Sequence, residues 1–498
     1  MTENVSVRGE SDNSARKEMV AAFTLFAGLA IAGGVAVAIG FHAVTALVLV
    51  AALMPIVTSV VAGKESTVVR ALILAGVAYL TISVLWPRYV AFWLPGLPSI
   101  NPPRMANILF LAVLVIALLK SVVVRAAISD SFDAFRVTWI IFGLYILSRL
   151  SSVLMSEDVA ASVYAILNEY AVHAVCLVLG LVCGVFPDGK RLLVRVVLWV
   201  FVAVCAVAII EVILGHNLFA RFVDPANSYV QWAVSDKARG GGYRAQGTFG
   251  FPITLAEFIV VAFPLALAGV INGASKKVWV VLGVLLIIFL TAFGVYASGS
   301  RSGYVGILAT GLFGFVVVST RGVWQRRLKL GHLVVSVFVG LIMTVVVYFA
   351  IVYVFDLAFG SAADRVSNSM RATMYEQSLR VIWEAPLFGF GPGSAPFKVG
   401  IMTASGQLTV DSRVVSLMID SGFSALFLYL ALVSATLLVS LRNAALSSER
   451  EWAASTAIAC SIFGFVPFFL ILSLNDNQFI LFFLIGIALA VEKAGSEN

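Results

Sequence analysis

The sequence predicts an all-α protein that crosses a membrane about fourteen times, and three observations support this fold class. Hydrophobic residues make up 61% of the 498-residue chain, charged residues only 12%, and the mean hydropathy is +1.02, a balance that excludes a soluble globular protein. The apolar runs are long enough to cross about 30 Å of hydrocarbon as helices. They lack the alternating pattern of a transmembrane β-barrel, and lipid leaves no other way to pair every backbone N–H and C=O group.

The apolar runs divide the chain into spans, the first two of which meet at a tight turn at Phe41-His42. In chain order the predicted spans are residues 18–40, 42–62, 68–86, 104–122, 134–154, 163–185, 190–214, 252–272, 276–297, 302–320, 331–356, 414–441, 452–474 and 477–493. We expect residues 1–17 to form a disordered cytoplasmic tail rather than a cleaved signal. Residues 18–493 then form a single transmembrane domain with two outer loops, 215–251 and 357–413.

The distribution of lysine and arginine predicts the orientation of the chain. Most of the 33 basic residues fall on the side that carries both termini, in short links such as residues 275–277 and 321–329. Because lysine and arginine resist translocation, this side is expected to be cytoplasmic. The net charge of +7 therefore reflects topology, and no nucleic-acid partner is expected. All four cysteines lie inside predicted spans as small apolar residues, so we expect no disulfide framework.

The remaining basic residues are informative because they lie on the outer side, where the positive-inside rule does not gather them. Arg301 occupies the short turn SGSRSG, residues 298–303, between two apolar helices. A guanidinium carried to the bilayer centre would cost about 2.5–3.5 kcal/mol, so its presence near the hydrocarbon edge requires a partner or a task. An anion is the obvious ligand. Most of the others lie in the two outer loops: Arg221, Lys237, Arg239 and Arg244 in the first, and Arg365, Arg371, Arg380, Lys398 and Arg413 in the second.

Three stretches carry a family resemblance, in order along the chain. They read YRAQGTFGFPITLAEF (243–258), SGSRSGYVG (298–306) and RATMYEQSLRVIWEAPLFGFGPGS (371–394), the last followed by MIDSGFSALFLYL (418–430). Their order and spacing resemble the O-antigen ligase and Wzy-type polysaccharide polymerase superfamily of bacterial inner-membrane glycosyltransferases. The shared features are an arginine and Gly-Thr-Phe segment before a helix, a Ser-Arg-Ser/Gly turn, and an arginine-rich helix that ends in a Pro-Leu-Phe-Gly-x-Gly-x-Gly turn. The first half of the chain is similar only in hydropathy.

The resemblance implies transfer of a sugar chain carried on undecaprenyl pyrophosphate, at the periplasmic face of the inner membrane. The expected partners are this lipid-linked glycan, membrane lipids, and the chain-length regulator and flippase of a polysaccharide export system. No carboxylate or histidine cluster has the spacing of metal ligands, so we expect a metal-independent enzyme without a cofactor.

Such a substrate needs a cationic site at membrane depth, and arginine suits it. A guanidinium makes two parallel charge-assisted bonds to phosphate oxygens and stabilises the charge that develops on the leaving pyrophosphate. The alternative for each arginine is a structural salt bridge or an interfacial anchor. The candidates for pyrophosphate binding are Arg244, Arg301, Arg365, Arg371 and Arg380, and of these Arg301 and Arg380 are expected to act in catalysis as well.

Helical geometry adds a supporting group in the second outer loop. On one helix, Glu376 falls on the same face as Arg365 and Arg380, where its carboxylate orients the two arginines or forms an ordinary solvated pair at i,i+4 spacing. The following Gly389, Gly391 and Gly393 permit positive φ or close approach. They form either a backbone nest for phosphate or, as we favour, a compact turn over the membrane. The turn lacks the Gly-Lys-Ser/Thr ending of a nucleotide-binding loop.

The general base is the least defined part of the site. Ligases and protein-glycosylating members of the superfamily often carry histidine and asparagine just before the helix that follows the large loop, whereas this chain reads TVDSRVVSLMIDSG at 409–422. Asp411 replaces the missing histidine as the base, or it caps the next helix together with Ser412. The intramembrane acids are partners of the arginines or polar contacts between helices: Glu169, Glu211, Glu257 and Asp420.

The missing histidine favours a polymerase, which lengthens lipid-linked repeat units into a surface polysaccharide or exopolysaccharide. The first alternative is an O-antigen ligase or oligosaccharyltransferase that moves the glycan to lipid A core or to protein. An alternative from another class is a membrane transporter or a flippase of lipid-linked glycans. Carriers usually contain repeats and midplane charges, but this chain shows no internal repeat, and its costly charges gather at the outer helix ends. That asymmetry favours an enzyme with one working face.

Overall fold

The computed structural model describes residues 65–91, 101–223, 231, 233–235, 238–239, 242–273, 276–324, 362–402, 408–448, 451–473 and 476–491. Three predicted spans lie outside these residues, namely 18–40, 42–62 and 331–356, as does the tail 1–17. Within the described part of the chain, nine helices are long and apolar enough to cross a membrane, or ten if one bent pair counts as a span. This confirms an all-α polytopic membrane protein.

The helices follow the apolar runs closely. They are α3 (Glu65–Leu85), α4 (Pro102–Lys120), α5 (Val122–Ala134), α6 (Arg136–Val153), α7 (Val159–Val185), α8 (Pro187–Leu214), α10 (Pro252–Gly273), α11 (Lys277–Ser298), α12 (Arg301–Trp324), α14 (Ala362–Val381), α15 (Ala395–Val399), α16 (Arg413–Leu446), α17 (Trp452–Gly464), α18 (Val466–Phe469) and α19 (Gln478–Ala488). Two short 3-10 helices are η1 (Ala220–Phe222) and η2 (Ile382–Glu384). Two antiparallel strand pairs complete the described elements: β1 (Ala238–Arg239) with β2 (Gly242–Tyr243), and β3 (Ile401–Met402) with β4 (Leu408–Thr409).

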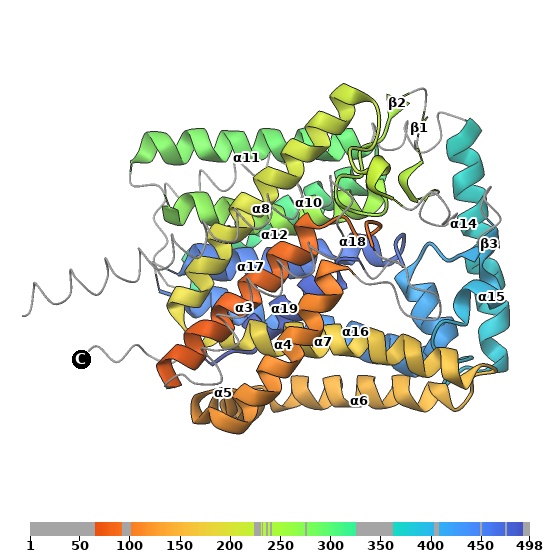
Figure 1. Ribbon diagram of the computed structural model, residues 1–498, viewed down its shortest axis with the longest axis horizontal. Coiled ribbons are helices and arrows are strands. Elements are labelled where there is room, and N and C mark those ends of the chain that lie inside the picture. The colour runs from red at the N-terminus through yellow and green to blue at the C-terminus, as the bar shows by residue number, and fades with distance from the viewer. Residues whose placement is uncertain are drawn as a thin grey trace, which may run out of the picture.

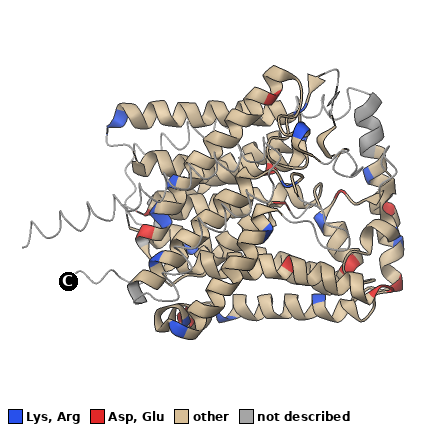
Figure 2. Ribbon diagram, in the orientation of Figure 1, with Lys and Arg blue, Asp and Glu red and all other residues tan. Residues whose placement is uncertain are grey.

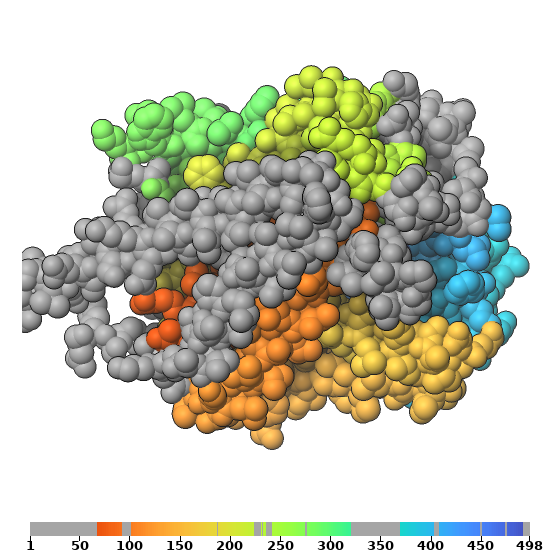
Figure 3. Space-filling model, viewed as in Figure 1, coloured from red at the N-terminus to blue at the C-terminus, as the bar shows by residue number. Residues whose placement is uncertain are grey.

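The long helices run between two ends of the molecule, which differ in what they carry (Figure 1). At one end lies α5, bent by 99° from α6. At the other lie α14, α15 and the strand pairs, which we call the loop end. Charged side chains are concentrated toward both ends, whereas the helices between them are drawn mostly in tan (Figure 2). The surface helices α4, α6 and α11 (Figure 3) expose apolar side chains such as Ile108, Leu147 and Phe289, as expected of a lipid-facing surface.

One predicted span differs from the structure. The run 477–493 forms α19, whose 11 residues extend about 16 Å and therefore cannot cross the bilayer. Every residue of α19 is buried, and it packs on α7 so closely that a Cβ added to Gly486 would lie 2.0 Å from the Leu177 carbonyl oxygen. Hydropathy did not reveal this, because a helix buried in protein is as apolar as one in lipid. The run 452–474 is a candidate span over Trp452–Phe469, which ends five residues before the predicted boundary.

A buried group of three charges joins α6, α7 and α16. The Glu169 carboxylate lies 2.6 Å from Nη2 of Arg149 and 2.8 Å from Nη2 of Arg413, and all three side chains are at most 8% exposed. Arg149 also donates through Nη1 to Ser421 Oγ at 3.2 Å. The Arg413 guanidinium lies 5.6 Å from the centroid of the Tyr429 ring. In a low-dielectric interior each of these charges is tolerated only because the others are present.

We expect Glu169→Ala to destabilise the protein strongly, because it leaves two buried guanidiniums without their counter-ion. Breaking a buried pair in this way costs about 3–5 kcal/mol in the free energy of unfolding. Thermal unfolding of the purified protein in detergent measures the loss. The matched control is Glu376→Ala, which removes an equivalent carboxylate from an exposed i,i+4 pair and should cost no more than about 0.5 kcal/mol. Equal losses from the two variants would contradict a structural role for the buried group.

Candidate functional site

Glycines shape the turn that follows η2, residues 385–394. Gly389, Gly391 and Gly393 have φ of 65°, 99° and 87°, in the left-handed region that favours glycine. Of the two uses that the sequence allowed for these glycines, positive φ is therefore observed at all three. The turn is consequently compact and carries the chain from η2 into α15.

The turn docks on α16 through its backbone. The N–H of Phe390 donates to the Ile419 carbonyl and the N–H of Gly391 donates to the Asp420 carbonyl, both at 2.9 Å. A Cβ on Gly389 would lie 2.5 Å from the Ile419 oxygen, so glycine is needed for this approach. Because these two N–H groups already have acceptors, they are not available to a phosphate. The geometry matches the compact turn rather than the phosphate nest.

A break in α16 receives the turn. Gly422 has a φ of 74° inside the helix, and a Cβ there would lie 2.3 Å from the Leu387 backbone. The N–H of Phe423 is released from the helix and donates to the Pro386 carbonyl at 2.8 Å. The turn and the broken helix thus complete one another's hydrogen bonds.

Asp420 supports the same loop rather than an arginine of the loop end. Its carboxylate accepts a hydrogen bond from the N–H of Ala395 at 2.8 Å, at the start of α15. The hydroxyls of Ser394 and Ser416 lie 3.4 Å and 3.5 Å from its two oxygens. Of the two sequence interpretations of this acid, a polar contact between elements is the one that the structure shows.

Arg244 meets the turn that leads into α12. Its Nε donates to the Ser298 carbonyl at 2.9 Å, and its side chain lies over Gly299, where a Cβ would be 3.1 Å away. Gly299 has a φ of 57°. Arg301 is the first residue of α12, two positions beyond this glycine. The structure therefore brings Arg244 to the turn of Arg301, although the two are far apart in sequence.

A buried carboxylate from α8 holds the segment that carries Arg244. Glu211 is fully buried and accepts hydrogen bonds from the N–H groups of Gln246 and Gly247 at 2.9 Å and 2.8 Å. The Tyr89 hydroxyl donates to the Gly247 carbonyl at 2.8 Å. The chain directly after Arg244 is thus fixed from two sides. Glu211 acts on backbone groups and not on an arginine.

Glu257 has a similar supporting position near the start of α10. Nδ2 of Asn477 donates to its carboxylate and to the Thr254 carbonyl, both at 2.9 Å. Beside it, Arg88 pairs with Asp476 at 3.1 Å. Arg88 was not predicted as part of the site, because it stands at the end of a span and outside the two large loops.

Asp411 lies beside Arg371, with Oδ2 3.9 Å from Nη2. The carboxylate side chain is 54% exposed, so an acceptor has access to it. Nearby protein atoms that displace water raise the pKa of Asp411 above its ordinary range, and the Arg371 guanidinium opposes this rise. The helix cap is Ser412, whose Oγ accepts from the Val415 N–H at 3.3 Å. Asp411 is therefore not needed as the side-chain cap of α16.

Arg380 belongs to a separate, solvated pair on α14. Its Nη2 lies 2.5 Å from Glu376 Oε1, and the two side chains are 77% and 66% exposed. This is the ordinary i,i+4 pair that the spacing allowed. Arg365 also lies in α14, but its side chain is outside the described part, so the predicted face shared with Glu376 remains a prediction.

Taken residue by residue, the structure places the candidates in three groups at the loop end: Arg244 with the turn of Arg301, Arg371 with Asp411, and Arg380 with Glu376. Arg149 was not predicted from the sequence as the partner of Glu169. A lone arginine inside an apolar run was the signal, since such a charge requires a counter-ion. Among the described residues, no group of three or more His, Cys, Asp or Glu side chains is arranged to hold a metal ion.

Comparison with known families adds an independent observation. Residues 285–430 match the family model described as O-Antigen ligase. The match contains the turn of Arg301, the α14 helix, the glycine turn and the broken part of α16, whereas Arg244 lies before it. A search of curated proteins found no match to this chain. The family resemblance predicted from the sequence is therefore confirmed: over residues 285–430, this chain matches the O-antigen ligase family.

Proposed function

We propose that this protein is a glycosyltransferase that polymerises undecaprenyl-pyrophosphate-linked repeat units into a surface polysaccharide or exopolysaccharide. The observation that carries the proposal is the approach of Arg244 to the turn of Arg301, inside and beside the segment that matches the O-antigen ligase family. Both arginines are half-buried, Arg301 at the start of the apolar helix α12 and Arg244 in the segment before α10. Such guanidiniums suit a lipid-linked pyrophosphate at the membrane surface.

The proposal includes a topology. The loop end faces the periplasm, and both termini and the α5 end face the cytoplasm of a bacterium, with the chain in the inner membrane. About fourteen spans form a single domain over residues 18–493, after a tail at 1–17. The basic links at the cytoplasmic helix ends support this orientation.

In the proposed reaction, an acceptor hydroxyl on one lipid-linked unit attacks C1 of the donor sugar. The new C1–O bond forms as the bond from C1 to the pyrophosphate oxygen breaks. Undecaprenyl pyrophosphate leaves with the electron pair, and the hydroxyl proton passes to Asp411. Arg244 and Arg301 hold the pyrophosphate and stabilise the charge that it gains, which favours the transition state over the ground state.

Asp411 is proposed as the base because its carboxylate is accessible and lies beside a cation. Arg371 orients the carboxylate from 3.9 Å. The Arg371 side chain is itself partly exposed, at 27%. Arg365 and Arg380 on α14 are proposed to extend the cationic surface toward the glycan.

The second candidate function is transfer of the glycan to lipid A core or to protein. The description of the matched family as O-antigen ligase favours it. The two functions share a donor and differ in the acceptor. Purified protein given only the lipid-linked repeat unit, without nucleotide or added metal, should lengthen it into a ladder that keeps pyrophosphate at one end. Single units that are transferred only when core oligosaccharide is added would establish the ligase function instead.

Arg301→Ala should abolish most polymer formation, and Arg301→Lys should not restore it. A lysine supplies the charge but not the planar pair of donors that a phosphate accepts. We expect a loss of about 100- to 1,000-fold in rate, the usual effect of removing one electrostatic contact to a developing charge. Elongation assays on variants present at equal abundance in the membrane measure this. Arg221→Lys, an exposed arginine of the same end stacked on Phe222, is the matched control and should keep full activity. Normal polymer from Arg301→Ala would refute the assigned role.

Asp411→Asn should slow elongation by about 100- to 10,000-fold while donor binding stays nearly intact, because a base acts on the acceptor and not on the phosphate. The base works only when ionised, so the wild-type rate should fall as pH falls through the pKa of Asp411. Because that pKa is raised, the fall should begin above the range of an ordinary aspartate, about 3.9. Rate profiles against pH for both proteins test this. An unchanged acid limb in the variant would show that another group is the base.

A further inference from the structure

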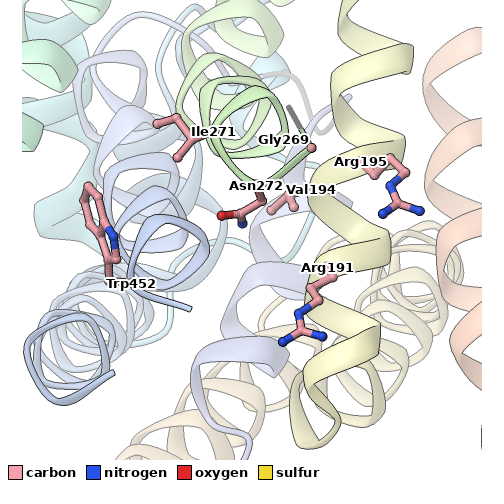
Figure 4. A pocket seen from close by; sticks show the side chains of 8 residues that line it. Arg191, Val194, Arg195, Gly269, Ile271, Asn272 and Trp452 are labelled. Carbon is pink, nitrogen blue, oxygen red and sulfur yellow. The ribbon is translucent and has the colours of Figure 1, made fainter. Parts of the chain in front are cut away.

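A cavity opens at the α5 end of the helices, away from the loop end. Its volume is about 400 Å³, and it lies between the beginning of α8, the end of α10 and the beginning of α17. Figure 4 shows Trp452 of α17 on one side, the two arginines of α8 on the other, and the Asn272 side chain between them. The residues that give it chemical character are Arg191, Arg195, Asn272 and Trp452.

The shape of the cavity follows from how α8 meets α10. A Cβ on Gly269 would lie 2.6 Å from the Val194 carbonyl oxygen, so the two helices are in backbone contact there. Beyond this contact α10 ends at Gly273, while α8 continues past it. The cavity lies where α8 extends beyond the end of α10. The last residues of α10 line one side of it, and Arg191 and Arg195 of α8 line another.

The described residues that line the cavity include two arginines and no carboxylate. Arg191 and Arg195 are four residues apart and so share a face of α8. Arg191 has one acidic neighbour, Asp188, at 3.4 Å, but Asp188 is 94% exposed, so water competes for this pair. Arg195 forms no hydrogen bond or ion pair with any residue that the structure describes. Together with the Asn272 amide, these groups offer many donors and no strong acceptor.

We propose that this cavity binds the phosphate headgroup of an anionic phospholipid. Two guanidiniums match the oxygens of a phosphate in charge and geometry. The site has the depth of a membrane surface, because Arg191 is in the second turn of a 28-residue helix and Trp452 is of the type that lines membrane interfaces. The same helix also exposes an apolar side chain to the surroundings, since Trp199 of α8 is more than half exposed. Basic pockets between helices on the cytoplasmic side are known to take anionic headgroups.

Arginines that only fix the orientation of the chain in the membrane need their charge alone. Here they also line a cavity, whose other residues come from α10 and α17. The distinction can be tested with the full-length protein in nanodiscs of phosphatidylcholine containing a minor fraction of phosphatidylglycerol. Phosphatidylglycerol that is retained after extraction is counted by native mass spectrometry. The variant Arg191→Ala/Arg195→Ala should lose about 25-fold in affinity, or about fivefold per arginine, the usual effect of one basic residue near an anionic surface. No sugar donor is present, so the outcome does not depend on the proposed enzyme activity.

The matched control is Lys276→Ala/Lys277→Ala, which removes two exposed charges at the N-terminus of α11, outside the cavity. Retention of the lipid by this control and by the wild type, but not by the arginine variant, would support the site. Equal losses from both double variants would show general attraction to a basic surface and would overturn it. Glycerol phosphate or inorganic phosphate is then added at millimolar concentration. Displacement of the lipid by either soluble ion would overturn a lipid source in favour of a soluble phosphate.

Discussion

Lipid offers no water to a charged group, so every charge inside this protein must meet its partner within the fold. The four intramembrane acids show how the chain satisfies this constraint. Glu169 joins two arginines, Glu211 binds two backbone N–H groups, Glu257 binds an asparagine amide, and Asp420 binds the start of α15. Each acid supports a segment near the loop end. They are therefore part of the framework of the site and need not touch the substrate.

The same constraint explains why the glycine turn and the broken helix α16 are joined by backbone hydrogen bonds. Helix α16 is broken at Gly422, and the N–H and C=O groups that this break frees would be costly in an apolar environment. The glycine turn supplies partners for them: the N–H groups of Phe390 and Gly391 donate to α16 carbonyls, and the Pro386 carbonyl accepts from the Phe423 N–H. The buried group around Glu169 holds the beginning of α16 in place. Asp411 lies just before this helix, so the fixed start of α16 positions its carboxylate beside Arg371 of α14.

Sequence patterns predicted the parts of this molecule that depend on local chemistry. Long apolar runs marked the described spans, and Gly389, Gly391 and Gly393 have the positive φ expected of them. Features that depend on tertiary contacts could not be predicted from the sequence. Hydropathy cannot tell that α19 is surrounded by protein, and spacing along α14 cannot show that Glu376 pairs in solvent. The approach of Arg244 to the turn of Arg301 joins residues over fifty positions apart and was visible only through the family resemblance.

The account rests on where the pyrophosphate binds. An experimental structure of the full-length protein in nanodiscs with undecaprenyl pyrophosphate, determined by electron cryo-microscopy, would test this most directly. We expect density for the two phosphates at the loop end, within hydrogen-bonding distance of the Arg244 and Arg301 guanidiniums. Two results would contradict the proposed pyrophosphate site. One is pyrophosphate bound only at the opposite end, between Arg191 and Arg195. The other is the absence of specific density at both Arg244 and Arg301.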